Sequence, residues 1–238
     1  MANGNHRGER LIAHLHPKSP ISEAYRTLRT NLHFSSMRGL IRLILLTSAG
    51  PEEGKSTTLA NLAVPLAQSG KKVLIADCDL RKPVQHKIFE APNLRGLTNL
   101  LVEGLEPLDV IQESKVPGIW IMTAGPIPPN PAELLDSMAF KELLPKLLEN
   151  YDHVLVDSPP AVAVTDAAII APQVHGVLLV IKSGEARNEM VKEAKAILDK
   201  SNARIIGVVL NGVEYSSDEY RYYYYYGRHK TEVAAGKE

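Results

Sequence analysis

The sequence has few cysteines, no excess of either charge and no long apolar run. Cys78 is the single cysteine among 238 residues, which excludes a disulfide within the chain and suits a reducing cytosol. The eight histidines show no metal-ligand spacing, so we interpret Cys78 as core filler rather than a redox or metal site. Lysine plus arginine and aspartate plus glutamate both total 27, so nucleic acid is not an expected partner.

Membrane segments are absent from the sequence pattern as well. No run reaches the ~18 apolar residues of a membrane span. Residues 1–10 contain no apolar stretch, so they do not read as a signal peptide. We therefore expect any membrane association to come through a partner.

Apolar runs of strand length alternate with helical patterns along most of the chain. The runs are continuously apolar, which is typical of strands covered on both faces of a parallel sheet. This alternation predicts an α/β fold: a doubly wound, mostly parallel sheet of the P-loop NTPase type with helices on both faces. The expected strands are Leu43–Thr47, Val73–Ala76, Ile119–Met122, Val154–Val156, Val177–Ile181 and Ile205–Leu210.

The expected organisation is one domain between two flexible ends. Residues 1–18 are predicted to form a flexible arm, residues 19–214 the domain, and residues 215–238 a flexible tyrosine-rich tail. Within the domain, a helix over residues 21–34 precedes the first strand, stands outside the alternation and is expected to pack outside the core.

Two further helices are predicted from local patterns. Asn130 as N-cap, Pro131 at the first helical position and Glu133 in a capping box predict a helix that continues to about Leu148. Apolar residues at helical spacing predict another over Met190–Lys200. The stiff proline-rich segment of residues 125–131 is either a spacer or a wall of a site.

A strand–loop–helix segment over residues 43–58 resembles a Walker A loop, with Ala49 where the general pattern has its first glycine. Gly54 lets the backbone approach a phosphate, and loop amides with the helix N-terminus then cradle the anion. Lys55 can reach the β- and γ-phosphates, and the Ser56 hydroxyl can ligate Mg²⁺. Because the segment lies between an apolar strand and a helix start, it indicates a nucleotide site rather than a structural turn.

Aspartates at expected strand ends supply oxygen ligands for a cation. Asp77 and Asp79, two residues apart, tend to project to the same side with Cys78 opposite, and Asp157 ends another strand in the manner of a Walker B acid. Because neighbouring carboxylates repel each other, a cation such as Mg²⁺ between them is favourable. Asp77 or Asp157 alone could merely cap a following helix, but all three beside a phosphate loop predict a Mg²⁺–nucleotide site.

Tyrosine is concentrated near the C-terminus. Six of the seven residues from 220 to 226 are tyrosine, interrupted by Arg221, and the flanking sequence is polar, so no packed core needs the run. By itself the run is either an inert adhesive tail or a set of phenols offered to an enzyme, and a nucleotide site in the same chain favours the second. The expected phosphate acceptors are Tyr220, Tyr222, Tyr223, Tyr224, Tyr225 and Tyr226.

Together these motifs resemble the bacterial tyrosine kinases that accompany capsule and exopolysaccharide synthesis, over roughly residues 22–226. The family's P-x-E-G-K-S-T, D-x-D-x-R, D-x-P-P and E-x-x-R-x-x-R patterns are all present, as is its autophosphorylated tail. The matching residues are Pro51, Glu53, Gly54, Lys55, Ser56, Thr57, Asp77, Asp79, Arg81, Asp157, Pro159, Pro160, Glu23, Arg26 and Arg29.

The resemblance implies an ATP- and Mg²⁺-dependent autokinase that phosphorylates its own tyrosine cluster, in trans within an oligomer, and regulates capsule or exopolysaccharide synthesis. It also implies the split form, a cytoplasmic kinase that a separate transmembrane adaptor recruits to the inner face of the membrane. A counteracting tyrosine phosphatase and other protein substrates are further expected partners. The family ties Glu23, Arg26 and Arg29 to ring-like self-assembly, although without it they read as a solvated charged stripe.

Roles follow for the individual residues. Lys55 and the loop amides would hold the phosphates, and Asp77 would orient the attacking tyrosine and accept its proton, unless Asp77 and Asp79 exchange roles. Arg81 would support the carboxylates or line the substrate entrance. The expected Mg²⁺ ligands are Ser56, Asp79 and Asp157, the last directly or through water. The expected nucleotide-binding residues are Gly50, Glu53, Gly54, Lys55, Ser56, Thr57 and Asn211, the last an adenine contact by position or simply a turn residue.

Two other classes of protein remain open on the same motifs. A ParA/MinD-like dimerising ATPase shares the fold, but such proteins typically carry an extra lysine early in the phosphate loop, and residues 48–53 contain none. The C-terminal amphipathic membrane helix of the MinD type is also replaced by the tyrosine run. The third class is a nucleotide-gated scaffold with little catalysis.

Overall fold

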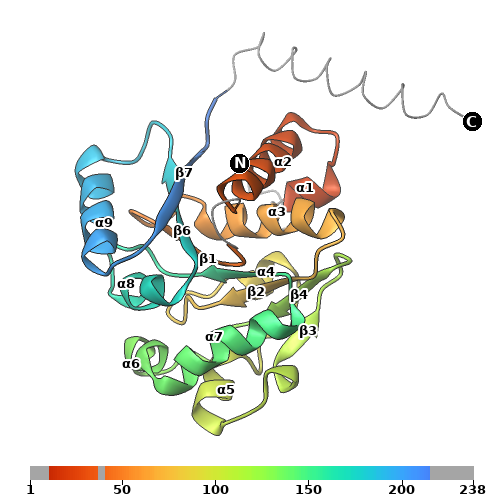
Figure 1. Ribbon diagram of the computed structural model, residues 1–238, viewed down its shortest axis with the longest axis vertical. Helices are drawn as coiled ribbons and strands as arrows, with labels where there is room; N and C mark the ends of the chain where they lie inside the picture. The colour runs from red at the N-terminus through yellow and green to blue at the C-terminus, as the bar shows by residue number, and fades with distance from the viewer. Residues whose placement is uncertain (1–10, 37–40, 215–238) are drawn as a thin grey trace, which may run out of the picture.

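The computed structural model describes residues 11–36 and 41–214 and shows a seven-stranded sheet between two layers of helices (Figure 1). The strand order is β3-β4-β2-β5-β1-β6-β7, and every neighbouring pair is parallel except β3 and β4. The strands are β1 Leu43–Ser48, β2 Val73–Asp77, β3 Ile111–Glu113, β4 Ile119–Met122, β5 His153–Asp157, β6 Gly176–Lys182 and β7 Ile205–Asn211. This confirms the predicted fold class.

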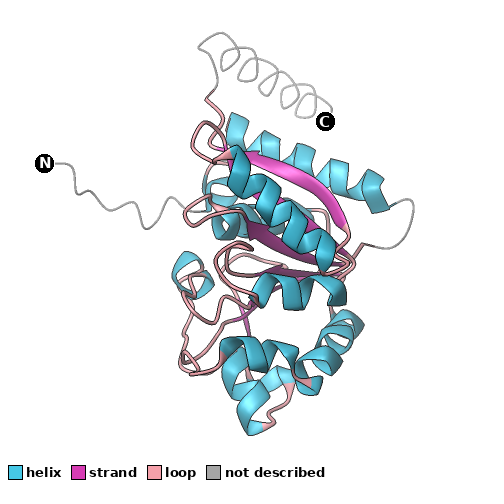
Figure 2. Cartoon of the chain, turned by 90° about the vertical axis from the view of Figure 1, so that its left-hand side faces the viewer, coloured by secondary structure: helices cyan, strands magenta, loops and turns pink. Residues whose placement is uncertain are grey.

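Helices cover both faces of the sheet (Figure 2). On one face lie α1 Ile12–Leu15, α2 Pro20–Ser36, α3 Lys55–Gln68 and α4 Gln85–Ile88. On the other lie α5 Leu97–Glu103, α6 Pro131–Asp136, α7 Met138–Asn150, α8 Asp166–Ile170 and α9 Asn188–Lys200. Short 3-10 turns occupy Pro107–Asp109 and Ala171–Gln173. None of these helices is long and apolar enough to cross a bilayer.

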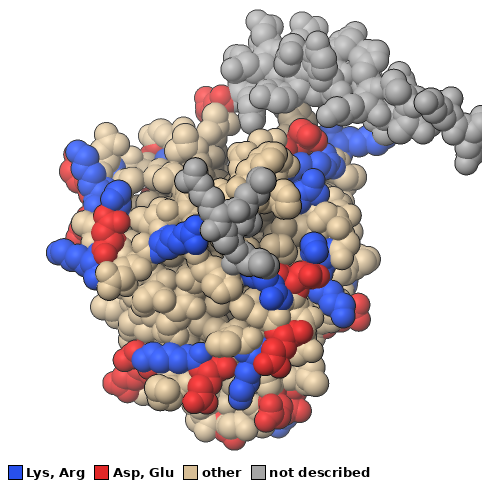
Figure 3. Space-filling view, viewed as in Figure 1, with Lys and Arg blue, Asp and Glu red and all other residues tan. Residues whose placement is uncertain are grey.

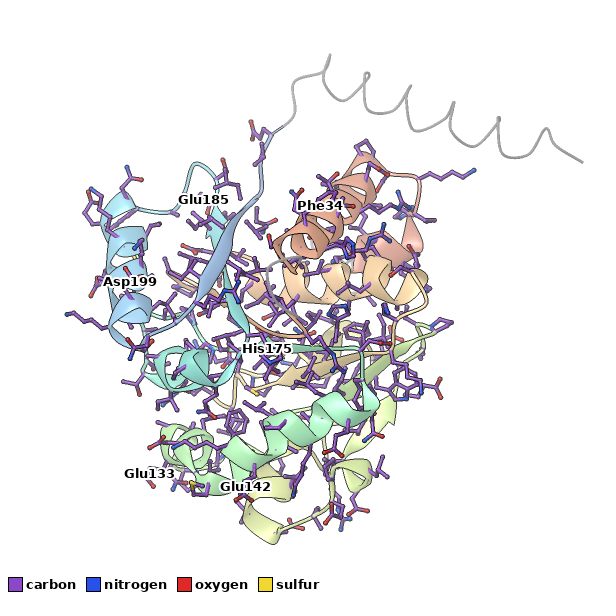
Figure 4. All side chains as sticks on the ribbon, in the orientation of Figure 1. Phe34, Glu133, Glu142, His175, Glu185 and Asp199 are labelled. Carbon is purple, nitrogen blue, oxygen red and sulfur yellow. The ribbon has the colours of Figure 1, made fainter. Side chains whose placement is uncertain are left out.

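Two apolar cores result from the alternation of side chains along the buried strands. In β2, Ile75 packs toward α3 on one face, whereas Leu74 and Ala76 pack toward α7 on the other. At the start of β6, the Nδ1 atom of His175 accepts hydrogen bonds from the backbone of Arg42 and Leu43 at 3.2 and 3.1 Å, which ties β6 to β1 (Figure 4). Continuous burial of the central strands explains why their sequences do not alternate.

The predicted helix over residues 130–148 is wrong in one respect, because it is two helices. Ser137 adopts an extended conformation that ends α6, and its hydroxyl then accepts from the Phe140 N–H at 3.3 Å to cap α7. The predicted capping box is also absent: the side chain of Asn130 makes no capping bond, and its amide donates to the Glu133 carboxylate instead. A serine N-cap inside the helical pattern was the available signal.

The predicted arm over residues 1–18 is too long. Within it α1 packs on α3, where Ala13 is buried and its N–H donates to the Asn61 side-chain oxygen at 2.9 Å. Helix α2 also contributes to the core through the buried Leu32, rather than packing outside it. Strand β3 was missed because it is a short, partly exposed edge strand.

Charges of both signs are interspersed over the face seen in Figure 3, which agrees with the formal net charge of zero. No single-signed field covers this face. Electrostatic recognition therefore has to come from local groups, such as those at the carboxyl ends of the central strands.

Candidate active site

The phosphate loop, residues 49–54, joins the end of β1 to the start of α3 in the middle of the sheet. Gly54 has a φ of 86°, and a Cβ atom there would lie 2.0 Å from the Nδ2 atom of Asn211, so both backbone and space require glycine. The Glu53 carboxylate accepts the Ala49 N–H at 3.0 Å and closes the loop on itself. Burial raises the pKa of Glu53, against the effect of the loop amides.

Lys55 brings the three motifs together. Its ammonium lies 2.9 Å from the Ser56 hydroxyl and 3.1 Å from one carboxylate oxygen each of Asp79 and Asp157. This meeting follows from the strand order, because β2, β5 and β1 are neighbours and their carboxyl ends share one edge. Burial alone would lower the pKa of Lys55, but the charges of Asp157 and Asp79 outweigh it and raise that pKa.

Asp77 is fully buried, and backbone amides occupy both of its oxygens. One oxygen accepts from Val84 and Gln85 at 3.1 and 2.9 Å, and the other accepts from Asp79 at 3.3 Å. Asp77 therefore caps the start of α4, which is the structural role left open for it above. Burial and, less strongly, the charge of Asp157 raise the pKa of Asp77 to about 8.

Ser56, Asp79 and Asp157 fit a divalent cation because their oxygens already surround one positive group, the Lys55 ammonium. Hydroxyl and carboxylate oxygens are the ligands that Mg²⁺ prefers. Cys78 contributes nothing here, since its side chain lies in the apolar core on the α7 face, as expected for filler.

Comparison with known proteins assigns the chain to a family. A protein-family model described as NUBPL iron-transfer P-loop NTPase matches residues 41–237. Tyrosine-protein kinase YwqD of Bacillus subtilis (strain 168) is 45% identical over 228 residues, which cover 94% of this chain and 96% of that protein. Putative tyrosine-protein kinase CapB of Staphylococcus aureus is 43% identical, over 91% and 95% of the two chains. The chain belongs to the bacterial tyrosine kinases.

Solved structures agree with this assignment. The chimerical protein CapA2B2 superimposes with a TM-score of 0.83 at 42% identity, over 87% of this chain and 91% of that one. The kinase domain of the Escherichia coli tyrosine kinase ETK gives 0.77 at 38% identity, over 82% and 78%. MinD of Pyrococcus horikoshii shares the fold at 23% identity and a TM-score of 0.63. The protein is therefore a protein-tyrosine kinase on a P-loop NTPase fold.

Two buried residues of this tyrosine kinase were missed from the sequence. Gln85 donates to the Ser56 carbonyl at 3.1 Å and to Asp157 at 2.8 Å, while its own oxygen has no hydrogen-bond partner among the described residues. Asp166, fully buried at the start of α8, accepts two hydrogen bonds of 2.9 Å from Arg81. An acid directly before the apolar run of α8 was the signal for Asp166, whereas no local pattern marked Gln85.

Asn211, the last residue of β7, contacts the phosphate loop. Its amide donates to the Glu53 carbonyl at 2.9 Å, from 158 positions along the chain. The side chain thus braces the loop beside Gly54. Thr57 lies in the first turn of α3, and Gly50 lies within the loop next to Met190 of α9, where an added Cβ would be 3.3 Å from the methionine methyl.

The three charged residues of α2 have different surroundings. Glu23 and Arg26 form an exposed ion pair at 2.7 Å, as the spacing predicts for a solvated stripe. Arg29 instead donates to the Pro65 carbonyl of α3 at 3.1 Å. The exposed Phe34 lies farther along the same helix (Figure 4). The tyrosines at 220 and 222–226 lie outside the described residues.

Proposed function

We propose that this tyrosine kinase uses ATP and Mg²⁺ to phosphorylate the tyrosine cluster of its own tail, in trans within an oligomer, and so regulates capsular or exopolysaccharide synthesis. The observation that supports this most directly is the meeting of Lys55, Asp79 and Asp157 within 3.1 Å. A tethered tyrosine run on the same chain supplies the substrate chemistry. About nine residues separate Asn211 from Tyr220, a reach of roughly 30 Å when extended.

Nucleotide binding rests on the phosphate loop and its supports. The loop amides and the α3 N-terminus bind the phosphates together with Lys55. To do so, the Lys55 ammonium moves away from the carboxylates of Asp79 and Asp157 and toward the phosphates. Ser56, Asp79 and Asp157 would hold Mg²⁺, which when bound neutralises charge on the phosphates. Gly50, Glu53, Gly54 and Thr57 shape the loop, and Asn211 holds it in place and contacts the adenine.

Proton transfer is assigned to Asp77. A free tyrosine has a pKa of about 10 and arrives protonated, and because the transition state is loose the base acts late. Asp77 adjoins the Lys55 cluster through the backbone of Asp79, and its raised pKa brings the carboxylate closer to the phenol in basicity. The alternative exchanges Asp77 and Asp79, and it is supported by the backbone amides that already donate to both oxygens of the buried Asp77. Arg81 acts as a support, since its guanidinium is held by Asp166.

Labelled ATP with Mg²⁺ tests the proposal. The wild-type chain should label its own tail, and Lys55→Met should not, whereas the control Lys195→Met on the exposed surface of α9 should label normally. Phosphate release without protein label would instead favour a ParA/MinD-like ATPase.

Transfer in trans is checked by mixing Lys55→Met chains with chains whose tail tyrosines are phenylalanine. Absence of label on the Lys55→Met chains would refute transfer in trans.

The partners belong to the same proposal. We place the kinase in the cytoplasm, recruited to the inner face of the membrane by a transmembrane adaptor whose cytosolic segment docks on it, and reversed by a tyrosine phosphatase. Other protein substrates are also expected. Tail labelling with and without a candidate adaptor's cytosolic segment tests this point, because recruitment that activates the enzyme raises the labelling rate.

A further inference from the structure

A basic groove lies beside the site, and its two lysines, Lys82 and Lys87, have no role in the chemistry proposed above. It is a cavity of about 570 Å³ between the segment that leads into α4 and the proline-rich loop after β4. We call it the α4 groove. The lining residues that matter here are Arg81, Lys82, Lys87, Asn93, Pro126 and Ile127.

Two lysines supply the charge of the α4 groove. Lys82 and Lys87 are exposed, and neither has an ion-pair partner among the residues that the structure describes. The guanidinium of Arg81 is neutralised by Asp166. Nearby acids are also occupied, because Glu90 pairs with Lys115 and Asp79 with Lys55. The groove therefore presents two uncompensated positive charges.

The opposite wall of the α4 groove is apolar and held in place. The Asn93 side chain clasps Gly125, accepting its N–H at 2.9 Å and donating to its carbonyl at 3.1 Å. The next residues, Pro126 and Ile127, are exposed, Ile127 by 65%. A peptide in this groove would meet lysines on one side and an apolar surface on the other.

The α4 groove adjoins both aspartates of the proposed chemistry. The Lys82 N–H donates to Asp79 at 3.0 Å, and the Val84 N–H donates to Asp77 at 3.1 Å. The same short segment thus lines the groove with its side chains and holds the two carboxylates with its backbone. Because an extended chain advances only about 3.5 Å per residue, the residues next to a peptide segment bound in the groove can reach the site.

The tail of this chain has a matching charge order. Asp218 and Glu219 directly precede Tyr220, and Arg228, His229 and Lys230 follow the tyrosine run closely. We propose that the α4 groove of one copy binds the acidic pair Asp218–Glu219 of another copy's tail, and thereby directs Tyr220 to the site. The basic end of the tail would be repelled, which sets the direction of the peptide. This inference rests on the proposed autokinase function.

A charge-swap experiment tests the α4 groove with full-length chains. Enzyme chains carry phenylalanine in place of the tail tyrosines, with or without Lys82→Glu and Lys87→Glu. Substrate chains carry Lys55→Met and phenylalanine in place of Tyr215 and Tyr222–Tyr226, which leaves Tyr220 as the one tail acceptor, with or without Asp218→Lys and Glu219→Lys. Either change alone should raise the KM for the substrate chain about tenfold with little change in kcat, because like charges then face each other. Combining both changes should restore the wild-type KM.

The matched control reverses two exposed lysines elsewhere, Lys146→Glu on α7 and Lys192→Glu on α9, and should leave KM unchanged. An unchanged KM in the groove variant, or a loss that the swapped substrate does not rescue, overturns the inference. If no tail is labelled in any pairing, the autokinase proposal fails instead. The groove is then tested alone by fluorescence anisotropy with a peptide of residues 215–226. Its binding should weaken when the protein carries Lys82→Glu and Lys87→Glu, and when the peptide carries Asp218→Asn and Glu219→Gln. Equal binding would refute it.

Discussion

The carboxyl end of the sheet and helix α2 both carry charged motif residues, but the protein supplies very different surroundings for them. At the sheet end Asp77 and Asp157 are fully buried, and each of their oxygens accepts a hydrogen bond from within the chain. On α2, Glu23 and Arg26 contact each other with 53% and 33% of their side chains exposed. The fold supplies hydrogen-bond partners for the carboxylates at the sheet end, whereas the ion pair on α2 is exposed to solvent.

The difference indicates where each set acts. Buried charges without partners are costly, so the sheet-end residues must have fixed partners in the single chain, and substitutions there change the single chain. Exposed pairs contribute at most about 1 kcal/mol, so the α2 pair adds little to the stability of the single chain. A function for Glu23 and Arg26 would therefore appear only in an assembly. The predictions below test this contrast.

The largest expected effect is on the pair of Arg81 with the buried Asp166. Arg81→Leu leaves a carboxylate buried and unpaired, and should lower the free energy of unfolding by about 3 kcal/mol in urea denaturation at pH 7. Arg81→Leu combined with Asp166→Leu should recover most of this loss, since no buried charge remains. Lys115→Leu, which breaks the exposed pair with Glu90, serves as the control and should leave the midpoint of urea unfolding nearly unchanged. Equal losses in Arg81→Leu and Lys115→Leu would contradict the contrast.

The next effect concerns the pH dependence of the reaction. Burial raises the pKa of Asp77 to about 8, so at pH 7 most of the free enzyme carries a proton on it. A base must lose that proton first, so kcat/KM for ATP should rise about tenfold per pH unit from pH 6 and level off above about pH 8. The Asp77→Asn enzyme should show a low rate without this rise. A rise that persists in Asp77→Asn would transfer the role of base to Asp79.

The fold was largely predictable because buried parallel strands have an unambiguous pattern. All six expected strands are present within about one residue at each end. The failures lie where local signals are weak or compete: β3 is short and polar, Ser137 restarts a helix inside one helical pattern, and α1 is too short to show periodicity. Tertiary packing decides such segments.

For the site, the motifs predicted which residues take part, but not which of their atoms contact each other. Alternation along the chain implies that the carboxyl ends of the strands share one edge, but Lys55, Asp79 and Asp157 meet because the strand order places β5 between β2 and β1. That Asp77 caps α4, and that Gln85 links Ser56 to Asp157, depends on how α4 turns back onto the sheet. No spacing in the sequence records that turn.

A smaller effect is expected at Asn211, which joins β7 to the phosphate loop. Asn211→Ala removes the donor to the Glu53 carbonyl, a hydrogen bond that contributes about 1 kcal/mol, so the KM for ATP should rise about fivefold. Asn130→Ala, whose amide contacts only an exposed glutamate side chain, is the control and should have no effect. If Asn211 braces the loop and does not contact the adenine, Asn211→Ala should raise the KM for GTP by the same factor. A selective loss for ATP would show the adenine contact proposed from its position.

The smallest effect on the single chain is expected on α2. Glu23→Gln removes half of an exposed i,i+3 pair, so the free energy of unfolding should change by less than about 0.5 kcal/mol, as it should for the control Asp199→Asn in the exposed pair on α9. Analytical ultracentrifugation then separates the two variants: Glu23→Gln should shift the chain toward smaller species, and Asp199→Asn should not. Sedimentation unchanged by Glu23→Gln would make the α2 pair a solvated stripe. A large loss of stability would instead mean that the charged residues of α2, like those at the sheet end, have essential partners within the single chain.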